Sequence, residues 1–407
     1  MSRPGRSTDR LGPTGRAAVV AGAAALAVGC AHGEAPGWRS RPGRVDARSW
    51  YYADNSGLRV STTALSVAQP VSRALTAGAQ GVIDRIEVER EPLEVEHQAG
   101  NQATGHHHDP DMVTSASAFA ADGEVATKWR FEGTVDLSAR GELLALPSEA
   151  RASVRIGTEP DYDGVSGALS ARTELFERNT TVTASLGYGH DTVSPVEAPP
   201  GQAALWPATH DRLTGGVAVS QVLSRSLVAS GGVGVTLQRG ALENPYRRAI
   251  VRTSLFPEQV PDARDRFTGF LGLSWSAGGG AALHLRSGLY VDSWGVVAAI
   301  PELALAKDLG GRALVLGRYR FYRQSAADFH RARYDALEPI LTGDARLGAI
   351  RDHVAGLEAR WIFLGAPGEA GAVTALAGYD VSFLTYEALE TDAIVAHAPN
   401  LGISVLY

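Results

Sequence analysis

Apolar residues occupy every second position along many stretches of the chain. The segment KWRFEGTVDL, residues 128–137, is the clearest case, and its apolar series is Trp129, Phe131, Gly133, Val135 and Leu137. Side chains of a β-strand point to opposite faces in turn, so this period of two predicts a strand with one apolar and one polar face. On a helix the same apolar residues would be scattered around the axis, which argues against a helical assignment.

The same alternation returns past residue 45, in 267–275, 283–291, 314–323, 357–363 and 373–383, with further runs near 149–157, 165–176, 179–190, 210–222 and 226–238. The apolar face of such strands meets either the core of a soluble β-sandwich or the lipid around a membrane β-barrel. In a barrel the opposite face lines the lumen. The predicted lumen-facing charges are Lys128, Arg130, Glu132, Asp136, Arg172, Glu174, Arg286, Arg318, Arg320, Glu358 and Arg360.

The connections between the predicted strands alternate in length. Short turns are predicted at 224–226, 277–280, 307–311 and 365–369, and long polar segments at 89–126, 191–209, 239–263, 327–350 and 387–395. Outer-membrane meanders have short periplasmic turns and long extracellular loops. We therefore expect a closed antiparallel transmembrane β-barrel of about sixteen strands, with fourteen as the alternative because the first two strands are weakly patterned. Segment 89–126 is the best candidate for a plug or lid.

The final residues, NLGISVLY, place Leu401, Ile403, Val405 and Tyr407 on one face. This resembles the terminal strand that the assembly machinery of the outer membrane recognises. Many other positions on the apolar faces are Gly or Ala, which lipid tolerates better than a densely packed protein core does. The barrel is therefore preferred to the soluble sandwich.

The N-terminus predicts export. Four arginines in residues 1–16 precede an apolar, uncharged stretch at 17–28, which is too short to span a bilayer as a helix and is typical of a signal peptide. The single cysteine, Cys30, follows Leu26 in a context that resembles a lipoprotein box, so residue 30 is either a lipidation site or a chance cysteine near the cleavage site. We predict a signal peptide over 1–30, a flexible leader over 31–44 and a barrel over 45–407.

The net charge of −6 gives no basic patch for nucleic acid. Past the signal peptide, no segment is apolar over the length that a transmembrane helix needs. The protein therefore leaves the cytoplasm, and it crosses a membrane with strands if it crosses one at all.

Several motifs resemble those of a known family. They are DMVTSASA (111–118), SEARASVRIGTEPDYDG (148–164), ERNTTVTASLGYGHDTVSP (177–195), GALENPYRRAIV (240–251), PDARDRF (261–267) and YRFYRQSAADFH (319–330). Together they resemble a family of outer-membrane barrel proteins of Gram-negative bacteria that is catalogued as a domain of unknown function. The resemblance implies a barrel in the outer membrane and no particular activity. It also implies an association with flavin-transferase-like proteins and small lipoproteins, and hence an envelope lipoprotein or redox protein as a partner.

Two stretches are candidate metal sites. In GHHHDPD, His106, His108 and Asp109 offer imidazole and carboxylate ligands, although histidine runs in loops are commonly solvated surface. In GTEPDYDG, Glu159, Asp161 and Asp163 offer oxygen ligands for calcium, but the spacing matches no standard calcium loop and also fits an ordinary turn. No cofactor is predicted.

The motif RYRFYRQ places Arg318, Arg320 and Tyr322 on one face, either as a cationic rib for anionic solutes or as partners of Glu358 and Glu174. No hydrolase or phosphate-binding motif occurs. An enzyme that used an outward Ser–His pair would place it at Ser185 with His190 or Ser287 with His284. We expect no catalytic activity and a role as a channel or partner-binding scaffold, with a barrel enzyme and a secreted soluble β-sandwich as alternatives.

Overall fold

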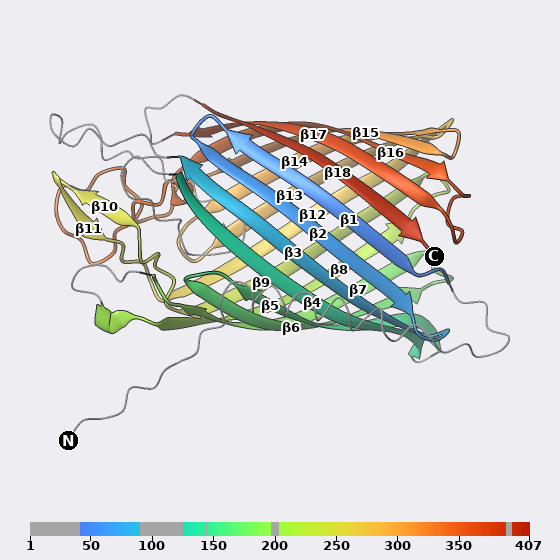
Figure 1. Cartoon of the computed structure of the whole chain (residues 1–407), viewed down its shortest axis with the longest axis horizontal. Coiled ribbons are helices and arrows are strands. Elements are labelled where there is room, and N and C mark those ends of the chain that lie inside the picture. The colour runs from blue at the N-terminus through green and yellow to red at the C-terminus, as the bar shows by residue number, and fades with distance from the viewer. Residues whose placement is uncertain (1–40, 90–124, 144, 197–202, 388–392) are drawn as a thin grey trace, which may run out of the picture.

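The computed structural model describes residues 41–89, 125–143, 145–196, 203–387 and 393–407. Sixteen strands close one antiparallel barrel, and β10 and β11 form a separate two-stranded hairpin beyond its rim (Figure 1). The strands are β1 (Arg44–Asp54), β2 (Leu58–Pro70), β3 (Leu75–Glu89), β4 (Val125–Leu143), β5 (Leu146–Thr158), β6 (Tyr162–Leu175), β7 (Thr180–Val193), β8 (Ala208–Val222), β9 (Leu227–Gly240), β10 (Arg248–Val251), β11 (Ser254–Pro257), β12 (Ala263–Gly278), β13 (Ala281–Asp292), β14 (Val297–Leu309), β15 (Ala313–Gln324), β16 (Ile350–Leu364), β17 (Val373–Tyr386) and β18 (Ile394–Leu406). Two short 3₁₀ turns, Ala203–Leu205 and Ala345–Leu347, lie in the connections.

The barrel is a meander in which each strand pairs with its neighbours along the chain. The one interruption is the step from β9 to β12, where the β10–β11 hairpin is inserted into the connection. The predicted closed antiparallel barrel is confirmed, and its strand number is sixteen rather than fourteen. At this size a barrel is too wide for side chains to fill its interior as they do in eight-stranded barrels.

The two ends of the barrel differ in their connections. At one end, called here the turn end, the strands are joined by short turns such as 223–226 and 310–312. At the other, the loop end, the connections between β9 and β12 and between β15 and β16 are long. A tight turn also occurs at the loop end, where an Asp54 carboxylate oxygen accepts hydrogen bonds from the backbone N–H groups of Ser56 (2.9 Å) and Leu58 (3.2 Å).

The apolar face of the strands points outward. Leu271 is 73% exposed, Val233 70% and Leu169 62%, and Trp129 of the opening motif lies on the same outward surface. The barrel is one closed sheet, so the soluble sandwich alternative, in which these side chains would be sealed between two sheets, is wrong. Within the described residues, no helix has the length and hydropathy needed to cross a membrane.

The first and last strands close the barrel. β1 pairs with β18 from Arg44 opposite Leu406 to Asp54 opposite Ala396, and the two strands lie side by side in Figure 1. The ladder continues past β18, because the Gly43 N–H donates to the Tyr407 carbonyl (2.8 Å) and the Tyr407 N–H donates to that of Gly43 (3.0 Å). The Tyr407 hydroxyl donates to Gln69 Oε1 at 2.7 Å, which ties the end of β18 to β2.

Candidate functional site: the inward face and the loop cluster

The inward face of the barrel carries the charged side chains. Because side chains alternate along each strand, the residues between the exposed apolar positions point into the interior. The structure places all the charges predicted to face the lumen on this inward face: Lys128, Arg130, Glu132 and Asp136 on β4, Arg172 and Glu174 on β6, Arg286 on β13, Arg318 and Arg320 on β15, and Glu358 and Arg360 on β16.

Near the loop end some of these charges are deeply buried. The Lys128 ammonium lies 2.5 Å from Glu159 Oε2 and 2.8 Å from Asp161 Oδ1, and all three side chains are at most 7% exposed. On the same wall, Arg130 Nε lies 2.6 Å from Asp84 Oδ2. Buried carboxylates need a partner of this kind, because an isolated charge out of water is very costly.

This arrangement bears on the candidate calcium site. Glu159 and Asp161 converge on Lys128, whereas the Asp163 carboxylate accepts a hydrogen bond from the Thr158 hydroxyl at 2.6 Å. Among the residues that the structure covers, no group of three or more His, Cys, Asp or Glu side chains is placed to hold a metal ion. The other candidate ligands, His106, His108 and Asp109, and the candidate lipidation site Cys30 lie outside the described residues.

Next to this cluster lies a small cavity in the inward wall. It has a volume of about 30 Å³, and its lining includes Tyr162, Asp191 and Arg212. Asp191 Oδ2 is 3.0 Å from His210 Nε2 and 3.7 Å from Arg212 Nη1. Gly164 leaves room for the Asp191 carboxylate, since a Cβ at position 164 would lie 2.5 Å from it. The cavity is large enough for a water molecule.

Toward the middle of the barrel the inward charges face open space. Arg151 Nη2 lies 2.9 Å from Asp136, and Arg155 Nη2 lies 2.7 Å from Glu132. The arginine side chains of these pairs remain 55% and 40% exposed. They are therefore accessible to water inside the barrel rather than packed against other side chains.

The opposite wall has its own ion pairs, which differ from those expected. Arg318 pairs with Asp380 on β17 (2.5 Å) and Arg320 lies 3.9 Å from Asp352, whereas we expected Glu358 and Glu174 as partners. Glu358 pairs with Arg360 on its own strand, and Glu174 with Arg172 and Arg178. Arg318 reaches across an intervening strand because Gly356 on β16 has no side chain, and a Cβ there would collide with both partners.

Between the charged walls lies a stretch of small uncharged residues. The inward positions of β7, β8 and β9 that bear it are Thr181, Thr183, Ser185, Gly187, Gly189, Thr214, Gly216, Ala218, Ser220, Ser230, Gly232, Gly234 and Thr236. The Phe270 ring covers Gly232, where a Cβ would lie 2.6 Å from the ring. This sector of the wall projects little into the interior.

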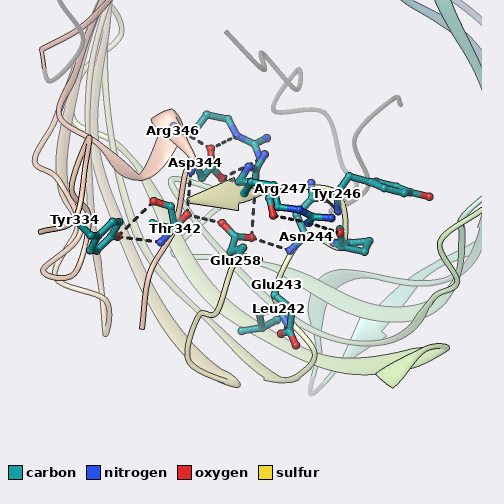
Figure 2. A network of polar contacts seen from close by, with 12 residues as sticks. Leu242, Glu243, Asn244, Tyr246, Arg247, Glu258, Tyr334, Thr342, Asp344 and Arg346 are labelled. Atoms are coloured by element: carbon teal, nitrogen blue, oxygen red, sulfur yellow. Dashed lines mark hydrogen bonds and ion pairs between the residues drawn. The ribbon is translucent and has the colours of Figure 1, made fainter. Parts of the chain in front are cut away.

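A second polar network joins two of the loops outside the barrel. We call it the loop cluster; it comprises Asn244, Arg247, Glu258, Tyr334, Thr342, Asp344 and Arg346 (Figure 2). Arg247 lies between two carboxylates, 2.9 Å from Asp344 Oδ2 and 3.8 Å from Glu258 Oε2. The Asn244 N–H donates to Glu258 (2.8 Å), the Thr342 hydroxyl also donates to Glu258, and the Thr342 N–H donates to the Tyr334 hydroxyl (2.9 Å).

The two carboxyl groups of the loop cluster titrate differently. Burial raises the pKa of Glu258 above its ordinary value and outweighs the attraction of Arg247. Burial also opposes ionisation of Asp344, but the charges of Arg247 and Arg346 outweigh this effect and hold the pKa of Asp344 well below the usual range. Asp344 is therefore the firmly ionised partner of the two arginines.

An apolar core supports the loop cluster. Ala249 and Val251 of β10 pack with Tyr334 and Leu341 from the connection between β15 and β16, and Phe256 of β11 lies against them. Val251 and Tyr334 also form a parallel bridge, and Gln259 and Leu341 an antiparallel one. The two loops thus form one packed unit. From their polar sequences, 239–263 and 327–350 were expected to be loops.

The two Ser–His pairs considered for catalysis are not assembled. Ser185 and His190 are an odd number of residues apart on β7, so they lie on opposite faces, and the same holds for His284 and Ser287 on β13. His190 Nδ1 instead lies 2.8 Å from Asp211 on the outward face, and His284 Nδ1 lies 2.9 Å from the Ser274 hydroxyl inside.

A family model described as "Protein of unknown function (DUF3570)" matches residues 17–367. No curated protein matches the chain. Among solved structures, a bacterial polysaccharide outer membrane secretin is 8% identical with a TM-score of 0.49, covering 90% of this chain and 99% of that one. The ferric enterobactin receptor of Pseudomonas aeruginosa is 11% identical (TM-score 0.44; 85% and 54% covered), and the outer membrane protein OpdK of the same organism is 9% identical (TM-score 0.39; 90% and 98% covered).

Proposed function

The chain belongs to the DUF3570 family, and we propose that it forms a channel for small polar solutes in the outer membrane. The observation that carries this proposal is the exposure of inward-facing guanidinium groups: Arg151, Arg318 and Arg360 are 55%, 47% and 48% exposed. Side chains packed across the interior would bury these groups. A sixteen-stranded barrel has the width for an aqueous passage.

Placement in a membrane is supported by the outward face. Its apolar side chains are exposed around the barrel, and β-strands of 12 to 16 residues, such as β13 and β12, exceed the roughly 9–11 residues that a tilted strand needs to cross a bilayer. Exposed apolar surface on this scale is otherwise rare in proteins.

The channel is tested by single-channel conductance of the purified full chain in planar lipid bilayers. Two adjacent positions near the middle of β7 give a matched pair: Ser185 faces inward on the small-residue sector and Leu186 faces outward and is 57% exposed. We expect steady conductance for the wild type, a smaller conductance for Ser185→Trp and an unchanged one for Leu186→Trp. Absence of conductance from the folded wild type, or equal effects of the two substitutions, contradicts the channel.

A partner-binding scaffold is the second candidate, favoured by the packed unit that the loop cluster builds beyond the rim. Envelope lipoproteins and redox proteins are the partners that we propose to test against it. The experiment is co-purification of such a protein with the full chain after crosslinking, compared with a chain carrying Leu255→Asp at the exposed tip of the β10–β11 hairpin. We also propose that β18, ending at Tyr407, is the segment recognised by the assembly machinery.

A further inference from the structure

The outward surface of β15 and β16 carries two opposed arginines near the loop end. Arg323 and Arg351 are cross-strand partners, and both are exposed on the same face as Tyr319. Like charges in directly opposed positions destabilise a sheet. The Glu387 carboxylate accepts a hydrogen bond from Arg351 at 2.8 Å and supplies one counter-charge. Within the part of the chain that the structure describes, the pair therefore keeps a net positive charge toward the outside.

Two histidines continue this surface two residues farther from the loop end than the arginines. His353 on β16 and His397 on β18 are each the fourth residue from the loop end of their strand. His353 Nδ1 lies 2.8 Å from the Tyr319 hydroxyl oxygen, and His397 Nδ1 lies 2.5 Å from that of Tyr379. Each ring thus uses Nδ1 within the sheet, which leaves Nε2 for a partner outside it.

From this arrangement we infer that the outward face of β15–β18 binds the phosphate-bearing headgroup of a lipid in the outer leaflet. Guanidinium groups bind phosphate through paired hydrogen bonds, and aromatic side chains gather at the level of lipid headgroups. A lipid is the occupant, rather than free phosphate, because the basic surface passes directly into exposed apolar positions, Leu357 on β16 and Leu401 on β18. The headgroup meets the arginines while the acyl chains cover the leucines.

Several other outward charges toward the loop end are paired with an opposite charge. Arg85 lies 2.6 Å from Glu87, Arg239 pairs with Asp265, and His190 lies against Asp211. The direct cross-strand opposition of two arginines, Arg323 and Arg351, distinguishes β15 and β16 from these pairs. Arg85, an outward arginine of β3 that is exposed to 46% and has its own carboxylate partner, provides a control. The inference depends on the membrane placement proposed above but not on the channel.

The test is native mass spectrometry of the full chain purified in a neutral detergent and titrated with diphosphorylated lipid A. Fully dephosphorylated lipid A and phosphatidylcholine serve as comparison lipids. We expect selective retention of the phosphorylated form by the wild type, and roughly tenfold to thirtyfold weaker retention by the double variant Arg323→Ala/Arg351→Ala, since each arginine near a membrane surface contributes about a factor of five. Arg85→Ala should bind as the wild type does.

A shift in electrophoretic mobility on heating verifies that each variant is folded before binding is compared. If the alanine double variant does not fold, Arg323→Gln/Arg351→Gln takes its place, and Arg323→Lys/Arg351→Lys is expected to restore part of the binding. Equal retention by the double variant and the wild type, equal loss in Arg85→Ala, or equal affinity for the dephosphorylated lipid overturns the inference. Binding of inorganic phosphate alone with no preference among the lipids also overturns it. A channel that conducts normally in any of these cases separates this failure from that of the proposed function.

Discussion

The ammonium group of Lys128 lies 2.5 Å from a carboxylate oxygen of Glu159, and both side chains are buried at the loop end of the barrel interior. Asp161 approaches the same ammonium, so one cation serves two carboxylates. The contact joins β4 to the connection between β5 and β6 and fixes this part of the inward wall.

Removing that cation should destabilise the barrel. Lys128→Met leaves Glu159 and Asp161 buried without their counter-charge, at an expected cost of about 3–5 kcal/mol. The measurement is the temperature at which the folded band is lost in heat-modifiability gels. Because barrel unfolding is commonly irreversible, the comparison is made at one heating rate.

Two further variants make this test specific. Adding Glu159→Gln and Asp161→Asn to Lys128→Met should recover most of the lost stability. Arg151→Ala breaks an ion pair whose arginine is 55% exposed and should cost at most about 1 kcal/mol. An Arg151 effect as large as that of Lys128 would disprove the role assigned to burial.

A second prediction concerns the two faces of β7. Leu186→Arg places a charge on the exposed apolar face near the middle of the strand and should reduce the stability of the protein in lipid by about 2–4 kcal/mol. Ser185→Arg places the same charge on the inward face, where we expect little change. Denaturant titration in lipid vesicles measures both, and similar values for the two variants would be incompatible with lipid contact at Leu186.

The fold was largely predictable because the outward face of most strands is mainly apolar along the middle of the strand. The weak pattern of the second strand has a physical cause. Near the loop end of β2 the inward residues Leu58 and Val60 are apolar and buried together with Ile86, whereas outward positions such as Arg59 are polar. The usual polarity of the two faces is reversed there, so alternation alone predicts the wrong face for these residues.

A third prediction concerns the loop cluster. Arg247→Ala leaves Asp344 and Glu258 buried without their shared cation and should destabilise the packed loops by about 3–5 kcal/mol. Hydrogen exchange of residues 244–258 and 334–344 should become faster while exchange in the barrel strands stays unchanged. Arg252→Ala in the same hairpin, where the exposed side chain donates to the Asp335 carbonyl at 2.7 Å, is the control and should have a small effect.

A fourth prediction follows from His330, which is buried beside the loop cluster. Burial lowers its pKa below the ordinary value of about 6.5, against the opposing charge of Asp344, and the charge of Arg331 lowers it further. Between the lowered pKa of the folded loops and the ordinary pKa of the unfolded ones, the unfolded state binds more protons. The stability of the loops is therefore complete above about pH 6.5 and decreases as the pH falls below that value.

Hydrogen exchange of residues 325–349, corrected for the intrinsic rates at each pH, measures this dependence. Opening of these residues should become more frequent between about pH 7 and about pH 5, and His330→Gln should flatten the response. An unchanged slope in the variant would assign the pH dependence to another group.

The candidate site was less predictable than the fold. Alternation indicated which charges of β4 point inward. The ion-pair partners of the inward charges, however, depend on cross-strand register and on glycines that leave room between neighbouring strands. Arg318 can pair with Asp380 only because Gly356 lies between them. The burial of Asp84 depends on its neighbours in the closed barrel. The β10–β11 hairpin escaped prediction because four-residue strands are too short for a period to be recognised.

The pairing of β1 with β18 has a consequence for biogenesis. Val45 lies opposite Val405, 405 − 45 = 360 positions farther along the chain. During synthesis the hydrogen-bonding edge of the first strand therefore remains unsatisfied until nearly the whole polypeptide has emerged. Exposed edges attract foreign strands and non-local pairings form slowly, so the open edge of β1 needs protection until β18 is available to pair with it.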